Sequence, residues 1–183
     1  IEEQTDGKQM SISSYRYSGD RTVLSYEEMN GYCNRAIKLN PNCKLTLILM
    51  QVNDMEDYMK NEGSGFVQDL LQSVQDTVRR HVGHRGIVCP LQPNLMSVVV
   101  QDINSDIKLR AFIESLRSRI AWNYRLIDPK YEISFSFGVA CYPENGMDMR
   151  IVHRKLVKAL QMAQEKHANC YVIYKEHLHG ELS

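Results

Sequence analysis

The spacing of hydrophobic residues along the chain separates segments that favour strands from segments that favour helices. Leu45–Val52 is a nearly continuous apolar run, which is typical of a strand buried on both faces of a sheet. Apolar and polar residues alternate through Tyr131–Ala140, and this pattern predicts a second strand. Shorter apolar runs predict three more strands, at Ile87–Cys89, Leu95–Gln101 and Tyr171–Tyr174.

A proline-rich stretch separates two of these short strands. Proline lacks the amide hydrogen that a strand ladder requires, so Pro90 is expected to end the first strand at Cys89. Pro93 then lies in a turn that leads into Leu95. The two strands on either side of this turn are expected to form a β-hairpin.

The first half of the chain contains two segments with the spacing of an amphipathic helix. The first begins after Ser25 and Glu28, which have the spacing of a capping box, and it continues to Leu39. The second has its apolar face within Phe66–Val78. It ends in Arg79–His81, where basic side chains favour the carboxyl end of a helix.

Two further helices are expected in the second half. Either Ser105 or Asp106 caps the first of them, and its apolar face is expected to run from Ile107 to Ala121. The second covers Ile151–Ala163. Helices therefore alternate with strands along the chain, with one hairpin between them.

This order predicts an α+β fold with a ferredoxin-like βαββαβ core. We expect a sandwich with a central, mostly antiparallel sheet and helices packed mainly on one face. Residues 1–21 are polar and contain glycine and serine, as in a linker or terminal tail. The folded domain is expected at residues 22–175, followed by a polar tail at 176–183.

The composition of the chain argues against several kinds of binding partner and site. The 22 basic and 22 acidic residues cancel, so no overall field attracts nucleic acid or an anionic membrane. No apolar run approaches the roughly 20 residues that cross a bilayer. The cysteines are odd in number and form no CxxC pair, which argues against a disulfide framework or a zinc site and favours the cytoplasm. They are Cys33, Cys43, Cys89, Cys141 and Cys170.

Several local strings resemble the GGDEF family of diguanylate cyclase-like domains over residues 22–175. The resemblance implies a palm-type, nucleotide cyclase-like fold. The strings that carry it are Leu45–Val52, Ser134–Ala140, Tyr142–Gly146, Leu156–Gln164 and Asn169–Tyr174.

The central motifs of that family do not match. Diguanylate cyclases join two GTP molecules with the help of metal ions, and such ions are held by carboxylates. The resemblance places neutral Gln51 and Asn53 where the first strand supplies an aspartate. The acidic pair of the signature hairpin becomes Asn94 and Leu95, and Pro93 stands where glycine lets backbone approach the nucleotide. These four vestigial positions predict that the domain is not an enzyme and holds no metal or cofactor.

Two other family positions also depart from the pattern. Arg85 is out of register with the inhibitory RxxD motif, and no aspartate follows it. The basic residue that contacts phosphate in the last helix is replaced by Gln164. The product-inhibition site is therefore not carried over to this chain.

Charged residues near these positions have simpler interpretations than metal or phosphate binding. Asp54, Glu56 and Asp57 are better explained as a solvated loop or helix start than as relocated metal ligands. His81 and His84 have no third ligand nearby in the sequence. The basic cluster Arg79, Arg80 and Arg85 is expected to lie at the carboxyl end of a helix, where positive charge is favoured. The alternative is that this cluster binds a phosphate group.

The resemblance therefore implies a non-catalytic regulatory or interaction module of a larger bacterial signalling protein. Its expected partners are other domains of the same polypeptide and a second copy of itself, without nucleic acid or membrane contact. The alternative is a receptor that keeps GTP or cyclic di-GMP in the old cleft. Asn53, Asn61 and Asn94 would supply its hydrogen bonds.

Overall fold

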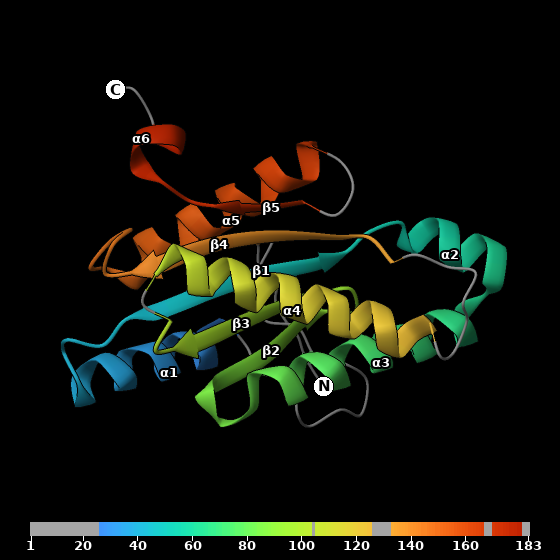
Figure 1. The fold of residues 1–183 in the computed structure, drawn as a ribbon, viewed down its shortest axis with the longest axis horizontal. Coiled ribbons are helices and arrows are strands. Elements are labelled where there is room, and N and C mark those ends of the chain that lie inside the picture. Colours follow the sequence, from blue (N-terminus) through green and yellow to red (C-terminus); the bar gives the residue numbers. More distant parts are fainter. Residues whose placement is uncertain (1–25, 104, 126–132, 167–169, 181–183) are drawn as a thin grey trace.

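The fold is a single sheet covered by helices (Figure 1). The structure is a computed structural model that describes residues 26–103, 105–125, 133–166 and 170–180. The expected capping residue Ser25 and the expected tail at 1–21 lie outside the described residues.

Strands and helices alternate much as the hydrophobic pattern predicts. The five strands are β1 (Leu45–Val52), β2 (Gly86–Gln92), β3 (Leu95–Gln101), β4 (Phe135–Tyr142) and β5 (Cys170–Ile173). The helices are α1 (Tyr26–Leu39), α2 (Met55–Glu62), α3 (Ser64–Val82), the 3-10 turn η1 (Gly83–Arg85), α4 (Asp106–Arg125), α5 (Met149–Glu165) and α6 (Glu176–His179).

The strand order in the sheet is β2-β3-β1-β4-β5. β1 lies at the centre and pairs antiparallel with both β3 and β4, while β5 pairs parallel with β4. The path from β1 through α3, β2, β3 and α4 to β4 is the predicted βαββαβ core. The fold prediction of a mostly antiparallel α+β sheet is confirmed.

Helices cover both faces of the sheet (Figure 1), so the expectation that they pack mainly on one face is wrong. Ile48 and Met50 of β1 face the core formed with α3 and α4. Leu47 and Leu49 face the opposite core, formed with α1 and α5. Successive side chains of a strand point to opposite faces, so the continuous apolar run of β1 serves both cores.

β2 continues through Pro90 to Gln92, beyond the expected end at Cys89. Among the described strands, β2 lies at the edge of the sheet, so one side of its backbone pairs with none of them. Edge strands tolerate proline for this reason. The pairing with β3 shifts in register between Pro90 and Gln92, so the irregularity is confined to the end of the hairpin.

Ser105, rather than Asp106, caps α4. Its hydroxyl accepts a hydrogen bond from the backbone amide of Lys108 at 3.2 Å. Ile107, expected on the apolar face, is 81% exposed. It precedes buried Leu109 by two residues, which is about 200° around a helix and therefore on the opposite side.

α6 lies where a polar tail was expected, and it contacts α5 through two lysines. Lys155 forms an ion pair with Glu176 at 2.6 Å, and Lys158 donates to the carbonyl of His179 at 2.7 Å. His177 is exposed, whereas His179 is half-buried and accepts a hydrogen bond from the backbone amide of Lys175. Within the part of the chain that the structure describes, no helix is both long enough and apolar enough to span a membrane.

Candidate functional site

The site predicted from the sequence lies where β1 ends beside the turn of the β2–β3 hairpin. Gln51 pairs with Leu95 across the sheet, and Pro93 with Asn94 forms the two-residue turn between the strands. A hollow of about 330 Å³ opens there. It is lined by Gln51, Val52, Asn53, Asp54, Met55, Glu56, Asp57 and Asn94.

Asn94 connects the hairpin turn to the end of β1 through two hydrogen bonds. Its side-chain amide donates to the carbonyl of Val52 at 3.1 Å, and its own backbone carbonyl accepts the amide of Val52 at 2.9 Å. A side-chain N–H donor is needed for the first bond, and a carboxylate has none at neutral pH.

Asn53 is held by β4 and the residue that precedes it. Its side-chain amide donates to the hydroxyl of Ser134 at 2.9 Å, and its side-chain carbonyl accepts from the hydroxyl of Ser136 at 3.2 Å. Neither serine was predicted as a partner of Asn53. Both lie on the same face of the predicted strand, since they are two residues apart, and this spacing is the signal that could have identified them.

Gln51 and Gln164 contact each other although they are far apart in the sequence. The side-chain amide of Gln164, on α5, donates to the side-chain carbonyl of Gln51. Both residues depart from the family pattern named above, and the structure brings them together as a neutral pair. This pair occupies part of the space at the end of β1 that faces α5.

Leu95 is only 5% exposed and packs in the core between the sheet, α1 and α5. It does not line the hollow. An ionised carboxylate at this position would lose its hydration without gaining a partner among the apolar side chains around it, which costs several kcal/mol or shifts its pKa upward.

The acidic residues at the hollow belong to the start of α2. Glu56 and Asp57 are exposed in the first turn, where negative charge is favoured by the helix dipole. Asp54 precedes the helix with φ 64°. Burial, and then the charges of Asp54 and Asp57, raise the pKa of Tyr58. Among the described residues, no group of three or more His, Cys, Asp or Glu side chains is placed to hold a metal ion.

Arg85, the member of the basic cluster that follows α3, binds the end of that helix. Arg85 donates to the carbonyl of His81 at 2.7 Å and lies 5.2 Å from the ring centre of Phe112. His81 packs against the same ring at 4.8 Å, and burial with nearby Arg119 lowers its pKa. These contacts support the helix-end interpretation over a phosphate or metal site.

Asn61 is exposed on α2 and does not line the hollow, unlike Asn53 and Asn94. The three asparagines of the receptor alternative therefore do not converge on one cavity. Two of them also use their side-chain amides in hydrogen bonds within the chain.

Comparison with protein families matches residues 26–170 to the family described as diguanylate cyclase, GGDEF domain. Comparison with curated proteins gives no significant match.

Solved structures of the same kind share the fold at low sequence identity. The active GGEEF domain of a diguanylate cyclase from Vibrio cholerae has a TM-score of 0.70 and 15% identity, covering 82% of this chain and 94% of its own. A diguanylate cyclase/phosphodiesterase from Caldicellulosiruptor saccharolyticus has a TM-score of 0.68 and 19% identity, covering 86% and 90%. The GGDEF domain of DgcB from Caulobacter crescentus, solved with c-di-GMP, has a TM-score of 0.69 and 12% identity, covering 92% and 98%.

Proposed function

Because this chain belongs to the GGDEF domain family of diguanylate cyclases, we propose that it is a non-catalytic member that acts as a regulatory or interaction module. The observation that carries the proposal is the set of neutral hydrogen bonds at the former catalytic positions. Gln51 pairs with Gln164, Asn53 pairs with two serines of the β4 segment, and Asn94 pairs with the backbone of β1.

Cyclase chemistry requires negative charge where these amides lie. A metal pair neutralises phosphate oxygens while a hydroxyl attacks, and hard cations of this kind prefer carboxylate ligands. Gln51 and Asn53 offer only neutral carbonyl oxygens, and both oxygens already accept hydrogen bonds. A metal ion here would meet neutral oxygens that already accept hydrogen bonds, and neither side chain supplies a negative charge to balance the ion.

The receptor alternative is less well supported than the module. In this hollow, one N–H of the Asn53 amide already donates to Ser134 and one N–H of the Asn94 amide donates to Val52, so fewer donors remain for a nucleotide. The third proposed donor, Asn61, lies outside the hollow. The hollow is also lined by exposed carboxylates at the start of α2, which repel phosphate.

The partners we propose are other domains of the same polypeptide and a second copy of this domain, in the cytoplasm. Solved relatives support the first of these, because one is an EAL/GGDEF domain protein from M. capsulatus and another contains the coiled coil and GGDEF domain of DgcB from Caulobacter crescentus. We place the domain itself at residues 22–175.

Calorimetric titration with GTP and with cyclic di-GMP, each with and without magnesium, tests the proposal. We expect no magnesium-dependent binding of GTP, because the site has no carboxylate pair to hold the ion. Magnesium-dependent, saturable binding would contradict the proposal. If it is lost in Asn53→Ala and kept in the matched surface variant Asn61→Ala, the receptor function is the correct one.

Sedimentation at several concentrations tests the second partner. Self-association that increases with concentration supports a module that works through dimers. A monomer at every concentration limits the module to contacts with other domains.

A further inference from the structure

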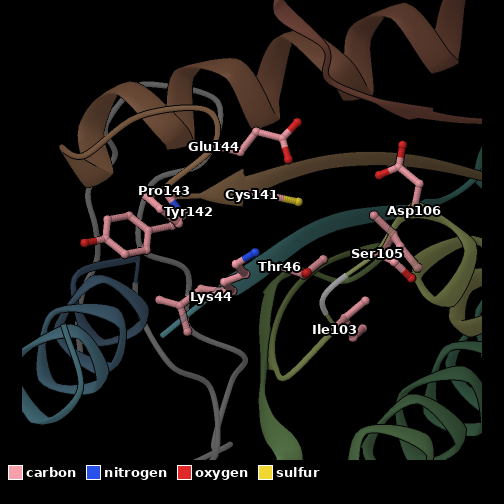
Figure 2. A pocket seen from close by; sticks show the side chains of 11 residues that line it. Lys44, Thr46, Ile103, Ser105, Asp106, Cys141, Tyr142, Pro143 and Glu144 are labelled. Atoms are coloured by element: carbon pink, nitrogen blue, oxygen red, sulfur yellow. The ribbon is translucent and has the colours of Figure 1, made fainter. Parts of the chain in front are cut away.

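A second hollow lies at the opposite end of the sheet from the vestigial site (Figure 2). Its volume is about 290 Å³. Three segments that are distant in sequence form it: the start of β1, the start of α4 and the end of β4. Pockets for drug-sized ligands begin at about 300 Å³, so this hollow suits a small metabolite.

The polar groups of this hollow carry charges of both signs. Figure 2 shows Lys44 on one side, with Glu144 and Asp106 across from it and the sulfur of Cys141 between them. Lys44 is exposed and pairs with no carboxylate among the described residues. Its ammonium group is therefore available to a ligand.

The two carboxylates are held together by Lys175. Its ammonium nitrogen lies 3.0 Å from a carboxylate oxygen of Asp106 and 3.2 Å from one of Glu144. Both carboxylates remain about half exposed, at 48% and 56% of the side-chain surface. Each can therefore accept a further hydrogen bond from a molecule that enters the hollow.

The charge balance decides the class of ligand. Lys44 and Lys175 together cancel Asp106 and Glu144. Burial raises the pKa of the Cys141 thiol to about 11, so this group adds no charge at neutral pH. A ligand with net charge would enter a neutral site and lose hydration without compensation. A ligand with one positive and one negative group keeps the balance and pairs with both sides.

We propose that this hollow binds a small zwitterionic metabolite of the free amino-acid class. Its carboxylate pairs with Lys44, and its ammonium group pairs with Asp106 and Glu144. The apolar side chains of Ile103 and Leu109 also line the hollow and contact the ligand side chain. Because the hollow lies at the other end of β1 from Gln51, the site acts independently of the former catalytic positions.

The test is a thermal-shift and calorimetric titration of the chain with each of the twenty L-amino acids separately. We expect saturable binding of at least one of them. Charged hydrogen bonds contribute about 1.5–3 kcal/mol, so Lys44→Gln and Glu144→Gln should each weaken binding by about tenfold or more. The matched variants Lys60→Gln and Glu56→Gln alter exposed charges on α2 and should leave the affinity unchanged.

Two analogues of the bound amino acid test the need for both charges. The amine without its carboxylate and the N-acetylated acid should each bind at least about tenfold more weakly. Lys44 is exposed, so Lys44→Gln keeps the fold even if Glu144→Gln disturbs Lys175; circular dichroism checks both variants.

The proposal is overturned if none of the twenty amino acids binds, if Lys44→Gln binds with unchanged affinity, or if either analogue binds as tightly as the parent amino acid. None of these outcomes bears on GTP at the other end of the sheet. A failure of this site is therefore distinguishable from a failure of the proposed module function.

Discussion

The side-chain amide of Asn94 donates to the carbonyl of Val52 at 3.1 Å, and the backbone amide of Val52 donates back to the carbonyl of Asn94 at 2.9 Å. The hairpin turn is thereby fixed to the end of the central strand. The sequence resemblance predicts an acidic residue at the position of Asn94 in catalytic members of the family. Here the side-chain amide contributes to the fold, because it donates a hydrogen bond to the Val52 carbonyl.

Replacing Asn94 with aspartate should therefore destabilise the domain. The new carboxylate faces a carbonyl oxygen, so the fold loses a donor and gains a repulsion. We expect a loss of about 1–3 kcal/mol in the free energy of unfolding at pH 7, measured with urea.

The pH dependence of this loss in stability tests whether the ionised carboxylate causes it. Repulsion raises the pKa of the new carboxyl above its unfolded value of about 3.9, so the deficit should shrink as pH falls through the folded pKa. The matched variant Asn61→Asp changes an exposed residue of α2 and should cost little. Equal stability of the two variants at pH 7 would show that the Asn94 hydrogen bond contributes nothing.

Replacing Gly138 with alanine should be strongly destabilising. A Cβ there would lie 2.3 Å from the backbone nitrogen of Leu160 and 2.8 Å from the carbonyl oxygen of Leu156, so α5 would have to move away from β4. Overpacking of this kind costs about 1–3 kcal/mol or more. Thermal or urea unfolding measures the effect.

Gly65 provides the control for that substitution. It lies in α3, and a Cβ built there meets nothing within 4 Å. Gly65→Ala should stabilise the domain by about 0.5–1 kcal/mol through helix propensity. If Gly138→Ala is as stable as Gly65→Ala, the close approach of α5 to β4 is incorrect.

His153 should make the domain less stable as pH falls. Burial lowers its pKa from 6.5 to about 4, so between these values the unfolded chain binds a proton that the folded chain does not. The contribution of neutral His153 is fully present above pH 6.5 and is lost towards pH 4, by roughly 3 kcal/mol at most.

His153→Leu should flatten this part of the pH profile, as measured by urea unfolding from pH 4.5 to pH 7.5. The exposed His177 on α6 gives the matched variant, His177→Leu, whose profile should follow that of the unaltered chain. An unchanged slope in His153→Leu would mean that His153 is protonated in the folded domain.

Lys175 should contribute a modest, salt-dependent stabilisation. It bridges Asp106 of α4 and Glu144 of the loop before α5, but both carboxylates are half exposed. Lys175→Met should cost about 1 kcal/mol at low salt and less in 1 M NaCl, because salt screens partly exposed pairs. Lys60→Met, on exposed α2, should show no such salt dependence. A cost that does not change with salt would point to packing rather than to the ion pairs.

The hydrophobic pattern was sufficient to place the central strand and the hairpin. The predicted bounds of β1 match the structure at both ends. A continuous apolar run of this length indicates a strand whose two faces are both buried, and β1 contributes to both cores. The sequence left the start of α2 open between a loop and a helix, since Tyr58 is the one buried residue of this helix and no apolar period is visible. The extension of β2 through Pro90 depends on its position at the sheet edge, which the local sequence does not encode.

The sequence shows which residue types stand at the candidate site, but it does not show their contacts. Neutral residues at Gln51, Asn53 and Asn94 are visible in the sequence, and the structure brings them to one end of the sheet. The pair between Gln51 and Gln164 joins residues 113 positions apart, so it requires α5 to be docked on the sheet. Leu95 was expected beside these residues but turns into the core, because β3 alternates between two buried faces.

The most direct test of the central claim is product analysis after the chain is incubated with GTP and magnesium. Chromatography should detect no cyclic di-GMP above a blank without protein, because Gln51, Asn53, Asn94 and Leu95 supply no carboxylate to a metal pair. The active GGEEF domain of the Vibrio cholerae diguanylate cyclase serves as the positive control under the same conditions. Formation of cyclic di-GMP by this chain would contradict the proposal that it is non-catalytic.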